Sequence, residues 1–260
     1  MKQGKIVFSF DDARVDSYDA IKIAQSYGIK STLNVTTGFV EGDLPDTNDD
    51  FPVTSMTKEQ VVELANNSFV EIACHSHNHT NEYEDIIKGK NILYDWICPK
   101  SNLGFVSPGS SVDFNKNPLS KFKEAGFLYV RIGPIWGRYA MIFRIIRKLS
   151  RIIGSSLLFY FGYKNTLNNA IKDNYLIHGV PVIHDNTLCQ FKYLVDKCAQ
   201  KGLTCVFIFH SILSKNDKMY DDNWSWDKEN YIQLCEYINS KLNNGIVTCF
   251  TYELLNKERC

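Results

Sequence analysis

The feature that most constrains how this chain can fold is a pair of adjacent aspartates, Asp11 and Asp12, directly after an apolar run at residues 6–10. An apolar run of this length between polar residues predicts a buried strand. Two carboxylates at the end of a buried strand repel each other, so a cationic partner is expected nearby. A second short apolar run, 72–74, leads into His75, His77 and His79. One carboxylate and two imidazoles form the ligand set of an open, catalytic divalent-metal site, and a second carboxylate is left beside it.

At these residues the sequence resembles the polysaccharide deacetylases of carbohydrate esterase family 4, which have a NodB-homology-like domain. Their first motif, (T/S)-F-D-D-G, is matched by Ser9-Phe10-Asp11-Asp12-Ala13, with alanine in place of the final glycine. Their second motif, H-(S/T)-x-x-H, is matched without departure by His75-Ser76-His77-Asn78-His79. The two motifs are specific together, because each ends a hydrophobic strand and they occur in the family's order. The resemblance covers nearly the whole chain and weakens in the middle.

The resemblance implies a role for each residue of the two motifs. Asp12, His75 and His79 would hold one divalent ion, with zinc as the first choice and cobalt, nickel or manganese as alternatives. Asp11 would be the general base that takes a proton from the attacking water. His75 and His79 are four residues apart, so in a helical or tight-turn conformation their rings can share one ion. The alternative is a polar loop of solvated histidines. His77 is expected to face elsewhere.

The family's third motif, R-x-P-x-G, is only partly matched, by Val106-Ser107-Pro108-Gly109-Ser110. The resemblance places Pro108 beside the substrate and gives the Gly109 N–H a role in holding the oxyanion. Val106 replaces the arginine that orients the base. Arg131, at the end of the next predicted strand, is a candidate replacement, and a rim arginine in water is an equal alternative. The fourth motif, with its Asp and Trp, is not recognisable, and residues 133–136 stand where it would be.

The fifth motif, a hydrophobic strand that ends in histidine, is matched by residues 206–210. It implies that His210 is the general acid that protonates the leaving amine, with His184 next in line. A neighbouring carboxylate normally raises the pKa of such a histidine, and Asp185 is the candidate for that group. Trp224 and Trp226 are candidates for stacking on sugar rings, and barrel packing is an equal alternative for both.

Predicted strands and helices alternate along the whole chain, which favours a parallel α/β architecture. The strands are expected at 4–10, 31–36, 69–74, 104–106, 127–132, 175–183 (broken at Gly179 and Pro181), 203–209 and 246–250. The helices are expected at 18–27, 57–65, 83–96, 118–124, 187–200 and 227–242. About eight strand–helix units favour a barrel over an open sheet. The resemblance implies a distorted (β/α) barrel with seven or eight parallel strands and a site at their C-terminal ends. The polar stretch 38–54 is expected to be a loop on the substrate rim.

The stretch Met141–Tyr163 does not resemble the family's core. Residues 1–260 are therefore expected to be a single catalytic domain with an atypical insertion at about 138–165. The basic residues Arg144, Arg147, Lys148 and Arg151 follow helical spacing, which places them on one face of a helix with aliphatic residues on the rest. The apolar run 152–163 is too short to span a bilayer. Two interpretations remain: a basic surface helix packed on the barrel, or a helix in a membrane interface beside anionic lipid.

Charge and cysteine content limit the partners and the compartment. The formal net charge is zero, which disfavours binding to nucleic acid. The eight cysteines include no Cys-x-x-Cys pair and several sit in apolar runs, which predicts free thiols in a reducing compartment. No signal peptide is visible after Met1. The expected location is the cytoplasm, with Met141–Tyr163 as the segment for any peripheral membrane contact.

The leading hypothesis is a metal-dependent hydrolase that removes N-acetyl groups from an N-acetylated sugar or glycan, such as a cell-envelope or capsule precursor. One alternative is a hydrolase of another non-peptide C–N bond on the same barrel. Another is a catalytically inactive carbohydrate-binding relative, because the third and fourth motifs are not intact. The presence of all the acidic and histidine residues of the other three motifs argues against inactivity, since a binding module needs neither a base nor an acid.

Overall fold

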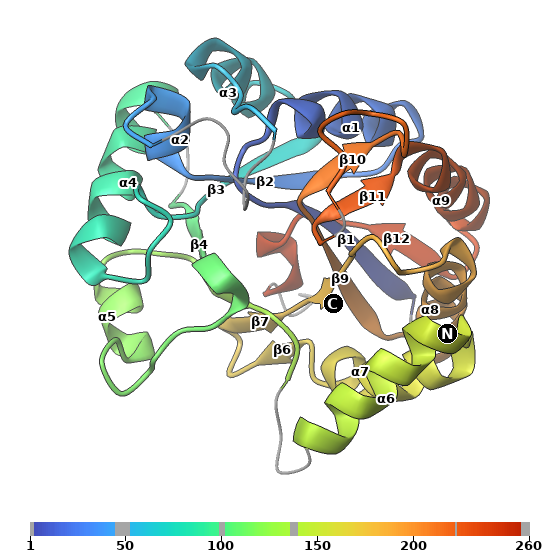
Figure 1. The fold of residues 1–260 in the computed structure, drawn as a ribbon. Helices are drawn as coiled ribbons and strands as arrows, with labels where there is room; N and C mark the ends of the chain where they lie inside the picture. Colours follow the sequence, from blue (N-terminus) through green and yellow to red (C-terminus); the bar gives the residue numbers. More distant parts are fainter. Residues whose placement is uncertain (1–2, 45–52, 99–101, 136–139, 222, 256–260) are drawn as a thin grey trace.

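The strands of this protein lie side by side in a sheet that curls round on itself, with helices on its outer face (Figure 1). The computed structural model describes residues 3–44, 53–98, 102–135, 140–221 and 223–255. The strands are β1 (Gly4–Phe10), β2 (Ser31–Val35), β3 (Val70–Cys74), β4 (Gly104–Val106), β5 (Val130–Ile132), β6 (Ile171–Lys172), β7 (Leu176–His178), β8 (Val180–Pro181), β9 (Thr204–Phe209), β10 (Ser211–Leu213), β11 (Ser225–Asp227) and β12 (Ile246–Thr248). The helices are α1 (Val15–Ser26), α2 (Thr37–Glu41), α3 (Lys58–Ala65), α4 (Tyr83–Ile97), α5 (Leu119–Glu124), α6 (Ala140–Ile153), α7 (Ser156–Asn168), α8 (Leu188–Lys201) and α9 (Lys228–Lys241), with short 3₁₀ turns η1 (Pro108–Ser110) and η2 (Tyr252–Leu254).

Strand β1 connects several strands of the sheet. It pairs in parallel with β9, β2 and β12, and parallel pairing continues from β2 through β3, β4 and β5 to β7. The residues of β7 pair with β5, while β8, just after Gly179, pairs with β9. This one segment therefore links the two ends of the sheet, and the predicted break at Gly179 is confirmed. The predicted α/β class with parallel strands is confirmed as well; β6 is an antiparallel addition to β7.

Side chains from alternate strand positions fill the inside of the sheet in layers. At one end, buried Glu71 accepts hydrogen bonds from Thr32, Tyr129 and the Thr251 N–H, at 2.8, 2.8 and 2.7 Å. The middle layer is apolar, and its residues are Val7, Ala73, Val106, Ile177 and Val206. Because side chains on one face of a strand recur every second residue, the residues two positions beyond Thr32 and Tyr129 point into the opposite end. That end is polar again and holds the site described below.

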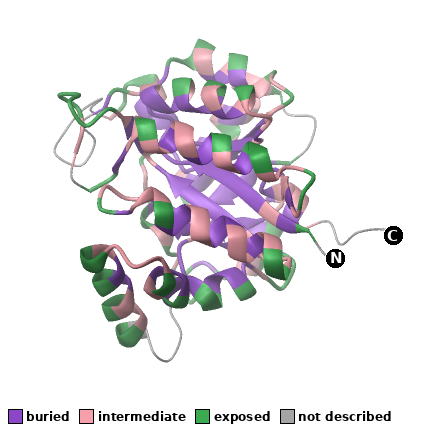
Figure 2. Cartoon of the chain, turned by 90° about the vertical axis from the view of Figure 1, so that its right-hand side faces the viewer, coloured by how far each residue is buried: buried purple, intermediate pink, exposed green. Residues whose placement is uncertain are grey.

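Aromatic packing on the outside of β1 and β9 fixes the two strands that end in Asp11 and His210. Phe8 and Phe209 meet edge to face with ring centroids 4.9 Å apart, and Tyr231 of α9 lies 5.5 Å from Phe209. Helix α8 contributes Phe191, which lies 5.3 Å from Phe207. Figure 2 shows the same division: the strands are mostly buried, while helices are buried toward the sheet and exposed on the far side. Such dense packing holds the strand ends in place.

Most helices occur where the sequence predicts them, and local signals explain their ends. Thr57 and Gln60 form the predicted capping box of α3, and Thr187 and Gln190 form a second at α8. Two differences appear. Residues 37–41 of the predicted rim loop form helix α2, while 45–52 lie outside the described residues. The insertion forms two helices rather than one, because Gly154 adopts a left-handed conformation at φ 71° between α6 and α7.

The cysteines of the described residues are free, and Cys74, Cys198, Cys205, Cys235 and Cys249 are buried as predicted, whereas Cys98 and Cys189 are exposed. Within the same residues, no helix combines the length and the apolar character needed to cross a membrane.

The buried carboxyl of Glu71 should make stability depend on pH. Burial raises its pKa to about 7, and its hydrogen bonds only partly offset that rise. A raised folded-state pKa contributes stability that is full below the unfolded value near pH 4.5 and is lost as pH rises through 7. Between pH 5 and pH 8, the free energy of unfolding should therefore fall by on the order of 2 kcal/mol more in the wild type than in Glu71→Gln. Urea denaturation at both pH values measures this, and equal pH dependence in the two proteins would contradict it.

Candidate active site

The turn after β1 directs two neighbouring carboxylates into the same pocket. Asp11 and Asp12 are 2% and 1% exposed, and Asp12 and Ala13 both adopt left-handed backbone conformations, at φ 75° and 58°. Side chains with a Cβ rarely adopt this region, which costs about 1 kcal/mol per residue. Ala13 therefore occupies a position at which glycine would be free of this strain.

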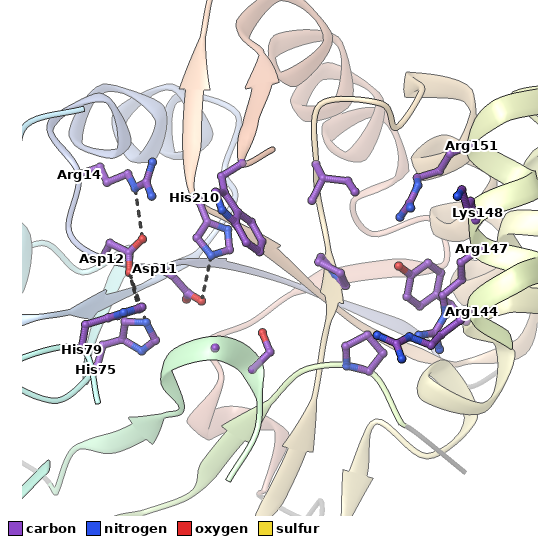
Figure 3. A pocket seen from close by; sticks show the side chains of 17 residues that line it. Asp11, Asp12, Arg14, His75, His79, Arg144, Arg147, Lys148, Arg151 and His210 are labelled. Carbon is purple, nitrogen blue, oxygen red and sulfur yellow. Dashed lines mark hydrogen bonds and ion pairs between the residues drawn. The ribbon is translucent and has the colours of Figure 1, made fainter. Parts of the chain in front are cut away.

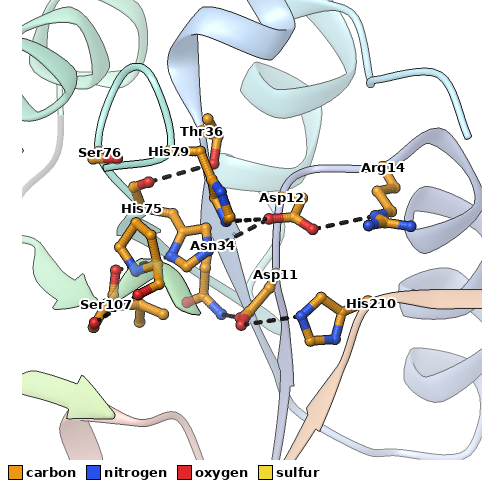
Figure 4. Close-up of polar contacts among 12 residues, drawn as sticks. Asp11, Asp12, Arg14, Asn34, Thr36, His75, Ser76, His79, Ser107 and His210 are labelled. Carbon is orange, nitrogen blue, oxygen red and sulfur yellow. Dashed lines mark hydrogen bonds and ion pairs between the residues drawn. The ribbon is translucent and has the colours of Figure 1, made fainter. Parts of the chain in front are cut away.

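Asp12, His75 and His79 converge around one point (Figure 4). Oδ1 of Asp12 lies 3.4 Å from Nε2 of His75 and 3.3 Å from Nε2 of His79. Nδ1 of His75 donates a hydrogen bond to the Val106 carbonyl at 2.8 Å, which leaves its Nε2 as an acceptor, as in metal-ligating histidines. Oδ1 of Asp12 is buried and accepts no hydrogen bond from the described residues. This donor set fits a divalent cation.

The electrostatic surroundings keep Asp12 ionised. Burial alone would raise its pKa, but the nearby imidazoles of His75 and His79 and the charge of Arg14 outweigh burial, so the pKa lies well below its usual range. Arg14 holds the other oxygen, Oδ2, at 3.2 Å from its Nε, and its Nη1 donates to the Ser211 hydroxyl at 2.9 Å. The acidic pair predicts a nearby cation, and Arg14 is that cation for Asp12. Its position in the sequence, only two residues beyond Asp12, could have identified it.

Asp11 is held by a different set of partners. Its Oδ1 accepts a hydrogen bond from Asn34 at 2.7 Å and a second from Nη2 of Arg131, which is fully buried. The alternative that Arg131 is a rim arginine in water is therefore wrong, and its role in orienting a base stays a prediction. Asn34 was missed, although an amide inside the buried strand β2 needs polar partners and could have been noticed for that reason. Oδ2 of Asp11 lies 3.9 Å from Nε2 of His210.

His210 lines the pocket in a different electrical state from the one expected. Burial lowers its pKa to about 4, although the charges of Asp11 and Asp12 act to raise it, so the ring is neutral at pH 7. The predicted support from Asp185 is wrong, because Asp185 forms an ion pair with Arg151, its Oδ2 lying 3.1 Å from Nε of the arginine. The His210 ring packs instead on Trp224, with ring centroids 4.5 Å apart.

The remaining predicted residues separate into those inside the pocket and those behind it. Trp224 is 39% exposed and lines the pocket, as do Gly109 and Ser110. Trp226 is 1% exposed, and its Nε1 donates to the Asn186 carbonyl, so the prediction that it stacks on a sugar is wrong and it packs in the core. Pro108 is buried behind the lining residues. Trp136, where a fourth motif was sought, lies outside the described residues.

His77 does face away from the other two histidines, as expected. It is buried, and its Nδ1 is 2.9 Å from the Thr37 hydroxyl. Its Nε2 lies 2.6 Å from the Lys88 ammonium group.

The pocket itself has a volume of about 640 Å³, which suits a small organic substrate (Figure 3). The group of Asp12, His75 and His79 lies at one end. At the other end, the pocket is lined by the basic residues of α6, namely Arg144, Arg147, Lys148 and Arg151. Neither interpretation of the insertion from sequence placed this basic face inside the pocket.

Comparisons with known proteins support the fold. No protein-family model matches the chain, and no curated protein matches its sequence. In structure, a CE4 family pseudoenzyme from Bacillus anthracis aligns with a TM-score of 0.51 and 10% identity, over 99% of this chain and 67% of that chain. A mutant of that pseudoenzyme with restored enzymatic activity aligns with a TM-score of 0.50 and 10% identity, over 99% and 70%. The catalytic domain of peptidoglycan N-acetylglucosamine deacetylase from Eubacterium rectale aligns with a TM-score of 0.47 and 14% identity, over 96% and 90%. The resemblance to carbohydrate esterase family 4 is thus confirmed at the level of the fold.

The convergence of Asp12, His75 and His79 predicts that metal content depends on all three. His79→Ala should weaken the affinity for a divalent ion by about a hundredfold or more, because one of three protein ligands is lost. His184→Ala, which removes a half-buried imidazole outside this group, is the matched control and should keep the wild-type metal content. Elemental analysis of the purified proteins after dialysis against zinc measures the difference. Equal metal in wild type and His79→Ala would show that the group is not a metal site.

Proposed function

We propose that this protein is a metal-dependent hydrolase that removes an N-acetyl group from an N-acetylated sugar or glycan. The observation that carries the proposal is the second carboxylate. Asp11 lies beside the group that fits a cation, but it is held by Arg131 and Asn34 rather than by the histidines. A site that only bound a cation would have no use for a separately held buried acid. The fold is also shared with carbohydrate esterase family 4, including a pseudoenzyme mutant with restored enzymatic activity, which supports the proposal.

The cation would be held by Asp12, His75 and His79, with zinc as the first choice and cobalt, nickel or manganese as alternatives. When bound there, a divalent metal supplies Lewis-acid chemistry, which activates water and polarises a carbonyl group. Arg14 keeps Asp12 aimed at this point by holding its other oxygen.

The chain's own groups can then move the protons that amide hydrolysis requires. Both donors to Asp11 bind Oδ1, so Oδ2 remains directed toward His210, where it can take a proton from the attacking water. Gly109 lies in the pocket wall, and we assign its N–H the donation to the oxygen that becomes negative when the carbonyl is attacked.

The leaving amine needs a proton, and His210 enters the reaction neutral. It cannot supply a proton of its own, so we assign it the transfer of the proton that Asp11 removes from water. Asp11 and His210 then act in series: water loses one proton, and the amine nitrogen gains it as the C–N bond breaks. This replaces the assignment from sequence, in which His210 was already protonated.

An assay of the hydrolysis products also tests two alternative functions. The barrel could act on a different non-peptide C–N bond, in which case no acetate is released but another amine appears. It could also be an inactive carbohydrate-binding relative, an alternative favoured by its likeness in fold to a pseudoenzyme.

We further propose that the protein is cytoplasmic and contacts a membrane surface through α6 and α7. The outward side of this helix pair exposes aliphatic and aromatic residues, namely Met141, Ile142, Ile145, Leu149, Ile152, Ile153, Leu157 and Phe161. Residues 140–172 contain no acidic residue and carry several basic ones, which suits an anionic bilayer. We call these exposed residues the apolar stripe. The stripe, rather than the basic face of α6, would contact the membrane, because the basic face lines the pocket.

Acetate release tests the catalytic proposal. The protein, supplied in turn with zinc, cobalt, nickel and manganese, should release acetate from at least one of a panel of N-acetylated sugars. Asp11→Asn should lower kcat about a hundredfold or more with unchanged metal content, because the acceptor for the water proton is lost. Asp173→Asn, the same change at an exposed turn, is the control. No acetate from any sugar with any metal would favour the inactive relative, unless another amine product is detected.

Co-sedimentation with phosphatidylglycerol vesicles tests the membrane contact. The wild type should sediment, and Ile145→Asp combined with Ile152→Asp should abolish sedimentation by placing charge on the apolar stripe. Met219→Asp, at a residue with 41% exposure in a distant loop, should leave sedimentation unchanged. A wild type that stays in solution would contradict the proposal, as would equal sedimentation of all three proteins.

A further inference from the structure

We propose that the basic face of α6 is an anion subsite of the active-site pocket and that the substrate carries a phosphate or pyrophosphate group on its sugar. The statement about the sugar rests on the proposed function, whereas the anion subsite rests on the pocket alone. The acetamido group would lie at the end with Asp12 and the histidines, and the phosphate at the end with α6 (Figure 3).

The subsite is supplied by one helix. Arg144, Arg147, Lys148 and Arg151 lie on successive turns of α6 and all line the pocket. Arginine in particular presents a planar set of N–H donors that matches phosphate oxygens in pairs. Several such donors along one wall suit an anion with several oxygens and more than one charge better than a single carboxylate.

Two of these cations are held in place by the second helix and by the adjoining loop. Arg147 is only 5% exposed; its Nε donates to the Gly162 carbonyl at 2.8 Å, and its guanidinium lies 4.4 Å from the centre of the Tyr163 ring. Any Cβ on residue 162 would come within 2.8 Å of the Arg147 side chain, so glycine is required where the arginine crosses α7. Arg151 is held by its ion pair with Asp185. Burying and ordering an arginine costs free energy that a simple surface helix would not expend.

The two ends of the pocket differ in the charges that line them. Residues 140–172 contain no Asp or Glu, and Arg151 is ion-paired with Asp185. The acids that line the pocket, Asp11 and Asp12, lie at the opposite end with their own cationic partners, Arg131 and Arg14. Four cationic side chains at one end of the pocket attract an anionic group such as phosphate more strongly than a neutral acetylated sugar.

Two sources can supply such a phosphate. A lipid-linked sugar phosphate would place its phosphate at the basic face of α6 and its chain toward the apolar stripe on the other side of the same helix. A nucleotide-linked sugar would bring the same phosphate chemistry without using that stripe. Either substrate would place its phosphate in the same subsite, and comparing the binding of the two substrates distinguishes them.

Calorimetric titration of the zinc-supplied, full-length protein tests the subsite directly. N-acetylglucosamine 1-phosphate should bind at least about tenfold more tightly than N-acetylglucosamine, and added salt should reduce the difference. Lys148→Gln, at an exposed side chain, and its combination with Arg144→Gln should progressively remove the preference. Lys164→Gln makes the same charge change at an exposed α7 residue outside the pocket lining and should keep it. Comparing a prenyl-phosphate-linked with a uridine-diphosphate-linked N-acetylglucosamine then assigns the source to the tighter binder.

Equal affinity for the two sugars, or a preference that survives the double substitution, would overturn the subsite. Acetate release measured on the same samples keeps the two proposals separate. Phosphate-dependent binding through α6 without release of acetate would leave the subsite standing and reject the deacetylase. Acetate release from N-acetylglucosamine 1-phosphate without any preference over the neutral sugar, at a rate unaffected by Lys148→Gln with Arg144→Gln, would do the reverse.

Discussion

The burial of two adjacent carboxylates is the constraint on which the rest of this structure depends. Asp11 and Asp12 are nearly inaccessible to water, and neighbouring buried charges of the same sign are tolerated only when each is compensated. The chain compensates them separately. Asp12 is surrounded by Arg14 and two histidines, and Asp11 by Asn34 and Arg131. These partners come from several strands and from the turns that follow them, so the charges are stable only if the strands curl around them.

This separation also assigns different chemistry to the two acids. The oxygen of Asp12 that faces the histidines lacks a hydrogen-bond donor among the described residues, which suits a cation. Asp11 has one oxygen fixed by two donors and another directed toward His210. Val106 stands at the position of the motif arginine, while Arg131 in the neighbouring strand β5 contacts Asp11. An arginine contact to Asp11 is therefore present although the third motif is incomplete in sequence.

The insertion changes what the pocket can recognise. Helix α6 is amphipathic with an unusual orientation, since its basic face lines the pocket and its aliphatic face is exposed. An ordinary surface helix buries its apolar residues. Helix α6 instead buries Arg147 and exposes its aliphatic face, while Arg144 and Lys148 are exposed beside the pocket. The helix thus contributes both to the active-site pocket and to the outer surface of the protein. Helix α6 therefore supplies one wall of the pocket, beside strands whose fold resembles a known family.

Local patterns in the sequence were sufficient for most strands and helices, the capping box of α3, the break at Gly179 and the placement of both motifs at strand ends, but not for α2, α7, β6, β10 and β11. These depend on neighbouring residues and on periodicities that are visible without the fold. Only the tertiary structure decided which distant groups meet. In the folded chain Asp185 pairs with Arg151, Trp226 is buried and Asn34 contacts Asp11. The basic face of α6 lines the pocket. Those contacts depend on strand register and helix packing between residues far apart in the chain, and periodicity along one segment carries no information about them.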